Sequence, residues 1–163
     1  LTMAWSSRYS ISTNSAASFA RARVSATTTV SRVTPEYVER GRPHVLQGKE
    51  IPSDVTILRI HSPFLFGATE KLREVTARME ALKPIVILRL RNMTAIDATG
   101  LREIQEFADT LAASGRTLLL CGALSQPAKL MAQAEFHRHV GAENILPNVD
   151  AALERARALR AAR

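Results

Sequence analysis

The segment from Asn92 to Leu101 holds the side chains best placed for chemistry, because an acid, a hydroxyl and a glycine meet there at one turn. It follows an apolar run and precedes a helical pattern, which places it at the carboxyl edge of a parallel sheet, the usual position of sites in open α/β proteins. A hydroxyl at the start of a helix is well placed for phosphorylation, since the helix dipole and the free N–H groups stabilise added negative charge. Thr99 is the candidate acceptor, and Gly100 permits close backbone approach beside it.

Two other roles for Asp97 stay open. Asp97 and Thr99 are both good helix caps, a role that contributes about 1 kcal/mol and needs no chemistry. An aspartate after a strand can also be a phosphate acceptor or a magnesium ligand, as in a small hydrolase or transferase. That role calls for acidic companions at the ends of other strands, and the sequence does not supply them there.

The remaining chemistry-bearing residues give weaker signals. Cys121 ends a run of leucines without a neighbouring base, which is typical of a buried apolar residue. His137 and His139 are two positions apart and do not face one another on a helix, so we expect no metal site. The sequence has no nucleophile elbow and no phosphate-binding glycine loop, and we therefore expect a protein that is not an enzyme.

Apolar runs predict the strands that position the turn. Residues 55–60 form a strand pattern, and a short second one follows at Phe64-Leu65-Phe66. Residues 85–90 are almost continuously apolar, as in a strand covered on both faces. Leu118 to Cys121 predicts another buried strand, and Ile145-Leu146 a brief last one.

Helical periodicity fills the intervals between these strands. A first apolar stripe comprises Ala68, Leu72, Val75, Met79 and Leu82. A second comprises Leu101, Ile104, Ala108 and Leu111, with Arg102, Glu103, Glu106 and Asp109 off the stripe. Gly115 ends that helix, Pro127 marks the start of the next, and Asn148 caps the final one. Alternating strands and helices predict a small α/β sandwich with a mainly parallel sheet, whose first strand pair is too closely connected to be parallel and forms an antiparallel edge.

Composition agrees with one globular domain. The chain has 163 residues, of which 46% are apolar and 23% charged, and this excludes a disordered protein. A single cysteine excludes a disulfide scaffold. The longest aliphatic run, residues 85–88, is far shorter than the roughly 18–20 residues that cross a bilayer.

The net charge of +7 is concentrated at the two ends of the chain. Residues 1–33 contain four arginines and no acid, and they predict a flexible Ser/Thr/Arg-rich lead-in to a domain over residues 34–163. The same composition fits an organellar transit peptide, and an opening on Leu1 indicates a fragment of a longer protein. The basic ends favour contact with phospholipid headgroups, whereas the scarcity of aromatic residues argues against nucleic acid.

Residues 96–101, Ile-Asp-Ala-Thr-Gly-Leu, resemble the signature loop of STAS domains, which occur in anti-anti-sigma factors and at the cytoplasmic ends of SulP-type anion transporters. Residues 60–72 resemble the SulP version, in which an apolar strand passes through a proline and aromatic segment into the first helix. Residues 143–147 and 151–156 are similar to the SulP ending, and residues 27–34 to the connector after the last membrane helix. The resemblance covers about residues 21–160.

This resemblance implies a non-catalytic regulatory domain on the cytoplasmic side of a sulfate or bicarbonate-type transporter. Its implied partners are the transporter membrane domain or other regulatory proteins, and nucleotide binding has been proposed for several family members. Thr99 matches the hydroxyl residue that is phosphorylated in anti-anti-sigma factors, while Ala98 stands where the family often has serine. The membrane domain of a transporter has no counterpart in this sequence.

The partner surface implied by the resemblance joins two segments, Asp97, Thr99 and Gly100 from the turn with Phe64, Phe66 and Gly67 from the earlier block. Phosphorylation of Thr99 would reverse the contact through added charge and bulk. Two alternatives remain: a free-standing phospho-switch of the anti-anti-sigma type, and a small enzyme that uses Asp97.

Overall fold

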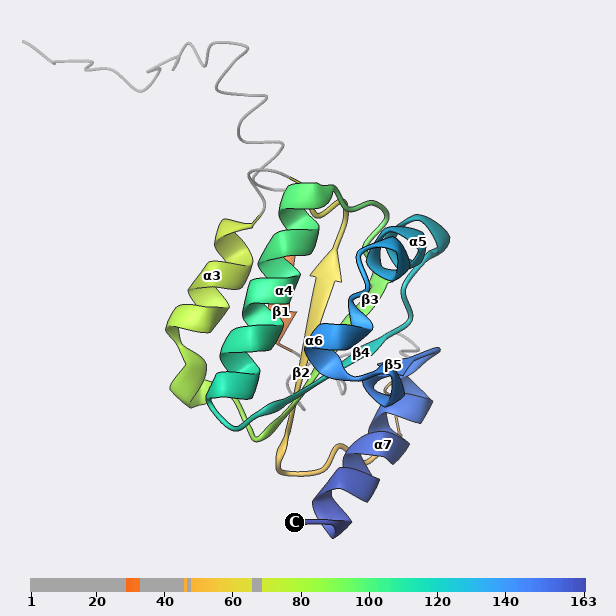
Figure 1. Ribbon diagram of the computed structural model, residues 1–163. Helices are drawn as coiled ribbons and strands as arrows, with labels where there is room; N and C mark the ends of the chain where they lie inside the picture. The colour runs from red at the N-terminus through yellow and green to blue at the C-terminus, as the bar shows by residue number, and fades with distance from the viewer. Residues whose placement is uncertain (1–28, 33–45, 47, 66–68) are drawn as a thin grey trace, which may run out of the picture.

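The computed structural model describes residues 29–32, 46, 48–65 and 69–163. A five-stranded sheet runs through it in the order of the sequence (Figure 1). Its strands are β1 (Thr29–Arg32), β2 (Val55–His61), β3 (Ile85–Asn92), β4 (Thr117–Cys121) and β5 (Ile145–Leu146). β2, β3, β4 and β5 run parallel to one another, and β1 pairs with β2 in the antiparallel sense. The predicted α/β fold with a mainly parallel sheet and an antiparallel edge is therefore confirmed.

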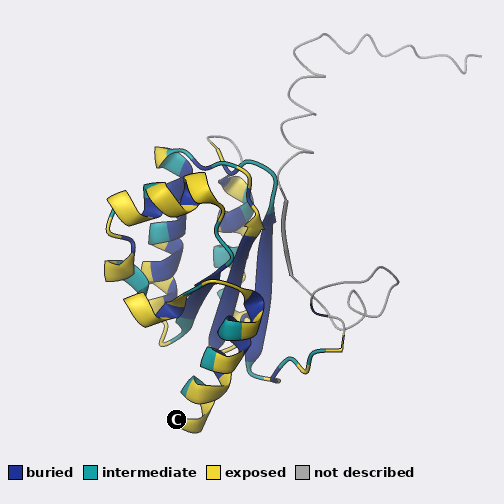
Figure 2. Ribbon diagram, turned by 90° about the vertical axis from the view of Figure 1, so that its right-hand side faces the viewer, coloured by how far each residue is buried: buried dark blue, intermediate teal, exposed yellow. Residues whose placement is uncertain are grey.

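Helices cover both faces of the sheet because the strands are apolar on both faces. One face carries α3 (Glu70–Ala77), α4 (Ala98–Ala113), α5 (Ser125–Gln133) and α6 (His137–Val140), and the other carries α7 (Val149–Ala161). In β2, β3 and β4, even-numbered residues such as Leu88 enter the first core, and odd-numbered ones such as Ile87 enter the second. Figure 2 shows the central strands mostly buried, with the exposed residues on the outward sides of the helices and in the connecting segments.

Local signals in the sequence explain where several elements end. The side chain of Asn148 accepts a hydrogen bond of 2.9 Å from the Ala151 N–H group and caps α7, as predicted. Gly115, with a φ of 75°, follows the end of α4, also as predicted. The helix expected over the first apolar stripe is shorter: α3 stops at Ala77, and a 3₁₀ turn (Met79–Ala81) completes the connection to β3.

The antiparallel edge is built differently from the prediction. Its partner for β2 is β1, in which Thr29 pairs with His61 and Arg32 with Leu58. Four residues of the predicted lead-in are thus part of the sheet, and the boundary at residue 33 falls after a strand. Phe64 and Leu65 do not form a second strand, because Phe64 makes only an isolated parallel bridge. Leu46, between β1 and β2 in the chain, is buried in a turn.

Glu103 departs from the predicted helical pattern, because it is buried although it lies off the apolar stripe of α4. Its carboxylate accepts two hydrogen bonds from the guanidinium of Arg73 on α3, one of them 3.0 Å long from Nε. This pairing raises the pKa of Arg73. α3 and α4 are consequently joined by an ion pair as well as by apolar contacts, and they lie side by side in Figure 1.

Candidate functional site

Two buried side chains fix the turn between β3 and α4 to the core. Met93 and Ile96 are buried in the core between the sheet and α4, and the Met93 N–H group bonds back to the Leu90 carbonyl oxygen at 2.9 Å. Thr94 and Ala98 are exposed between and beyond these anchors. The turn therefore presents a short outward surface on a fixed backbone.

Asp97 caps the helix that follows. Its Oδ1 accepts a hydrogen bond of 2.7 Å from the Gly100 N–H group, and its carbonyl oxygen accepts one of 2.9 Å from Leu101. Of the two predicted caps, Asp97 holds this position, and Thr99 lies inside the first turn of α4. Thr99 is half-buried, and helix geometry leaves its N–H group and that of Ala98 without an intrahelical acceptor.

Gly100 is required by the close approach of a neighbouring chain segment. A Cβ atom built at this position would lie 2.2 Å from the carbonyl oxygen of Phe64 and 3.0 Å from its ring. The Phe64 N–H group donates to the Ala95 carbonyl oxygen at 2.8 Å, and Phe64 bridges to Ile96. The two sequence blocks that were predicted to form one surface are thus in contact.

The role predicted for Phe64 needs a correction. Its side chain is fully buried in the core, so it supports the turn from inside and cannot itself touch a partner. Gly100 is buried as well and acts through the absence of a side chain. Phe66 and Gly67 lie outside the described residues. The exposed residues of the turn are Thr94 and Ala98, and Ala95, Asp97 and Thr99 are half-buried.

Gln126, at the start of α5, holds the turn from a third side. Its Oε1 accepts a hydrogen bond of 3.0 Å from the Ile96 N–H group, and its Nε2 donates one of 2.9 Å to the Ile96 carbonyl oxygen. The side-chain amide of Gln126 thus satisfies both backbone groups of Ile96, as a neighbouring strand would. Sequence reasoning did not identify Gln126, because the partners are 30 residues apart and no local pattern links them.

Basic residues lie near the carboxyl ends of β2 and β3, on the same face of the sheet as α7. Arg59 and Arg89 are register partners on adjacent strands and are each only 8% exposed. Burial, together with the charges of Arg59 and Arg89, lowers the pKa of His61. The His61 ring nitrogen Nδ1 lies 3.2 Å from the side-chain amide of Asn92. Two arginines on adjacent strands thus act on the ring of His61 at this edge of the sheet.

The described residues contain no group of three or more His, Cys, Asp or Glu side chains that could hold a metal ion. His139 is paired with Asp109, its Nδ1 lying 2.8 Å from Oδ1, and does not converge with His137. Cys121 is buried, and burial raises the pKa of its thiol to about 11, in agreement with its prediction as an apolar residue. The arrangement at Asp97 positions a helix and displays a hydroxyl, and its one described carboxylate serves as a cap.

Residues 48–152 match the family model for the STAS domain. The chain belongs to the STAS domain family. The crystal structure of a sulfate transporter family protein from Wolinella succinogenes has 30% sequence identity to it, with a TM-score of 0.67 over 74% of this chain and 99% of that one. The turn at residues 96–101, predicted as the signature loop, lies inside the matched range.

Further solved structures extend the likeness. The STAS domain of a SulP transporter from Vibrio cholerae is 26% identical, with a TM-score of 0.61 over 70% of this chain and 89% of that one. A putative anti-sigma factor antagonist from Thermotoga maritima shares the fold, with 18% identity and a TM-score of 0.56 over 66% of this chain and 92% of that one. No curated protein sequence matches this chain. The STAS domain thus resembles the SulP domains in sequence and in fold, as predicted.

No helix among the described residues is long and apolar enough to cross a membrane.

Proposed function

We propose that this STAS domain is a non-catalytic regulatory domain of a SulP-type anion transporter, placed on the cytoplasmic side of the membrane, and that it binds a protein partner through the turn between β3 and α4. The observation that carries the proposal is the fixation of this turn. The buried side chains of Met93 and Ile96, the cap by Asp97 and the clamp by Gln126 hold its backbone, so that a partner meets a preformed surface.

Thr99 is the position at which this contact would be reversed. A phosphate on its hydroxyl would add a charge of about −1.5 to −2 to a half-buried surface at the start of α4. The modified chain itself would tolerate that charge, because the helix dipole and the free N–H groups of the first turn favour anions. Arg102 lies three residues further on the same side of α4 and is exposed, so it can pair with the phosphate. A partner that approaches this surface loses its fit without any unfolding of the domain.

Contact with inner-leaflet phospholipids stays a prediction for the basic lead-in, which lies almost entirely outside the described residues. The arginines of α7 support phospholipid contact less, because all three of them make contacts within the domain. Arg155 donates to Asn144 at 3.0 Å, Arg157 donates to the Glu50 carbonyl oxygen at 3.3 Å, and Arg160 lies 4.0 Å from Asp54.

Binding to a transporter membrane domain tests the proposal directly. The 163-residue chain would be titrated against the purified membrane domain of the Vibrio cholerae SulP transporter in detergent, with biolayer interferometry as the readout. We expect saturable binding that Thr99→Glu weakens at least tenfold. Thr110→Glu is the matched control, since Thr110 is an exposed threonine near the far end of the same helix.

Two results would contradict the proposal: wild-type chain that does not bind, or Thr99→Glu that binds as tightly as Thr110→Glu. The anti-sigma-type alternative gives a different outcome, in which the chain binds and is phosphorylated at Thr99 by an anti-sigma kinase but ignores the membrane domain. Circular dichroism of each variant shows whether the fold is retained.

A further inference from the structure

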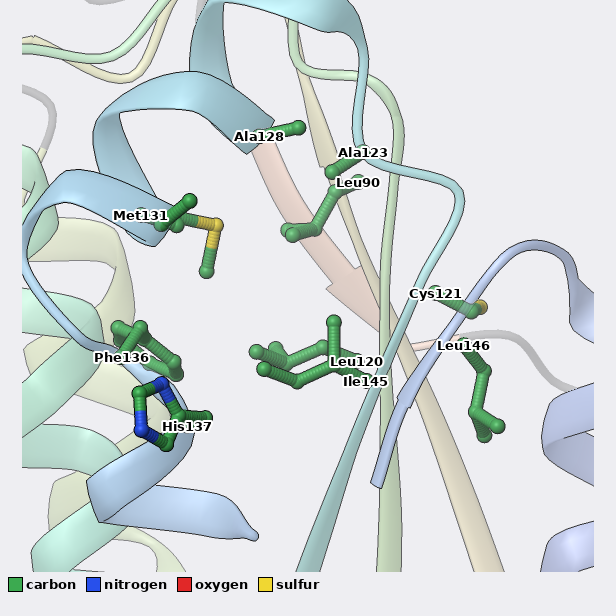
Figure 3. A pocket seen from close by; sticks show the side chains of 11 residues that line it. Leu90, Leu120, Cys121, Ala123, Ala128, Met131, Phe136, His137, Ile145 and Leu146 are labelled. Atoms are coloured by element: carbon green, nitrogen blue, oxygen red, sulfur yellow. The ribbon is translucent and has the colours of Figure 1, made fainter. Parts of the chain in front are cut away.

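A cavity lies on the far side of α5 from the turn, between α5, α6 and the carboxyl ends of β3, β4 and β5 (Figure 3). Its volume is about 190 Å³. The residues that line it are Leu90, Leu120, Cys121, Ala123, Ala128, Met131, Ala132, Phe136, His137, Ile145 and Leu146. They come from several secondary-structure elements, so the cavity is part of the folded framework.

The wall of the cavity is apolar except at one point. His137 is the only lining residue with a nitrogen-bearing polar side chain, and it is exposed, which places it at the mouth. In Figure 3 its ring lies next to that of Phe136, at one end of the cavity. The side chains of Cys121 and Leu146 belong to the second core and point away from the cavity in Figure 3, so the side chains that a ligand would meet are apolar except for the imidazole of His137.

Small side chains keep this space open. Ala128 and Ala132 are one turn apart on α5, and Ala123 precedes that helix. Elsewhere on this face α4 fills the space above the sheet with large residues, such as Phe107 and Leu111. Four of the lining residues, Ala128, Ala132, His137 and Ile145, are exposed and mark the open side of the cavity.

The volume sets the size of the occupant. An apolar cavity of about 150 Å³ in another protein stays dry and binds benzene, and one further water-sized group occupies about 30 Å³. A space of about 190 Å³ therefore accommodates a benzene-sized ring with one small substituent. The apolar wall disfavours charge inside the cavity, because a buried charge there would have no partner.

We propose that this cavity binds a small uncharged molecule consisting of one apolar ring and one hydroxyl-type substituent, with the ring between α5 and the sheet and the substituent hydrogen-bonded to His137. The site is separate from the turn at Thr99, and the proposal does not depend on the regulatory function.

Phenol and toluene are a matched pair of probes, equal in size and different only in the hydroxyl group. Each would be titrated into the 163-residue chain, followed by methyl and amide chemical shifts in two-dimensional NMR. We expect saturable shifts that are largest at the lining residues, for both probes. His137→Ala should weaken phenol binding about fivefold, the effect of one hydrogen bond, and leave toluene binding within twofold of its original value.

Filling the cavity should abolish binding. Ala128→Leu places a larger side chain in the space, and Ala113→Leu is the control, because Ala113 is an exposed alanine at the end of α4 and does not line the cavity. Ala123→Leu is a second filling variant if the first one fails to fold. Only the two filling variants should lose both probes.

The proposal is overturned if the wild-type chain shows no saturable shifts, if the filling variants bind as well as Ala113→Leu, or if His137→Ala weakens both probes equally. Sedimentation analysis supplies one more outcome. A dimer that Ala128→Leu dissociates would identify a second copy of the chain as the occupant and would refute a small-molecule site.

Discussion

Gly100→Ala is the sharpest test of how the turn is built, because two physical effects predict opposite signs. Gly100 lies in the first turn of α4, where alanine is favoured over glycine by about 1 kcal/mol. Helix propensity alone therefore predicts a more stable protein.

Packing predicts the reverse. The added Cβ would lie 2.2 Å from the Phe64 carbonyl oxygen, whereas ordinary van der Waals contact begins at 3.4 Å, so one of the two segments must move by more than 1 Å. Neither moves freely, since the Phe64 N–H group is bonded to Ala95 and the Phe64 ring is buried. Overpacking of this kind costs about 1–3 kcal/mol, and contact with a backbone atom belongs at the upper end. The net expectation is a loss of about 1–2 kcal/mol in the free energy of unfolding.

Urea unfolding followed by circular dichroism measures this loss, and thermal unfolding should show a Tm lower by about 5 °C. Ala112→Gly, at an exposed position near the other end of α4, measures the propensity effect without the contact. A Gly100→Ala protein as stable as the wild type, or more stable, would refute the close approach of the two segments as the reason for the glycine.

Three further variants or reactions test other parts of the structure. Asp97→Ala should lower the free energy of unfolding by about 1 kcal/mol in urea, and Asp97→Asn should retain most of the cap. Arg73→Met should destabilise the protein more than Arg102→Met does in the same assay, because only the first leaves a carboxylate buried without its partner, and equal effects would contradict this. Cys121, whose pKa burial raises to about 11, should react with an aromatic disulfide reagent at pH 8 about 100-fold more slowly in the folded chain than in urea. Since the folded state keeps a proton that the unfolded thiol releases, stability should fall as the pH rises from about 9 to about 11, and a flat profile there would argue against burial of the thiol.

The sequence predicted those features that depend on neighbouring residues. Asp97 and Asn148 act as caps because the cap forms within three residues of each. The parallel strands were identified because a strand buried on both faces is apolar throughout, as residues 85–90 are. The signature loop could be placed at the start of a helix for the same local reasons.

Features that depend on distant partners were missed. β1 is a short polar-apolar segment, Thr-Val-Ser-Arg, and only its pairing with β2 makes it a strand. Glu103 is buried because Arg73 comes from another helix to meet it, which periodicity along α4 does not reveal. Phe64 was expected on the partner surface because its segment resembles the SulP block beside the signature loop, but its position against Gly100 is set by the tertiary fold.

The strand order of the sheet has a consequence for assembly during synthesis. Each strand pairs with the one that precedes it in the chain, so no later strand has to be inserted between two that are already joined. A nascent chain that has emerged as far as β4 already holds four adjacent strands and both α3 and α4. It still lacks α5, α6, β5 and α7. Of these, α7 is the helix that covers the second core, so until it arrives the side chains of Ile57, Ile87 and Leu119 stay open to water on that face. Truncation immediately before α7 should therefore yield chains that aggregate through this one uncovered apolar face and keep the opposite face folded.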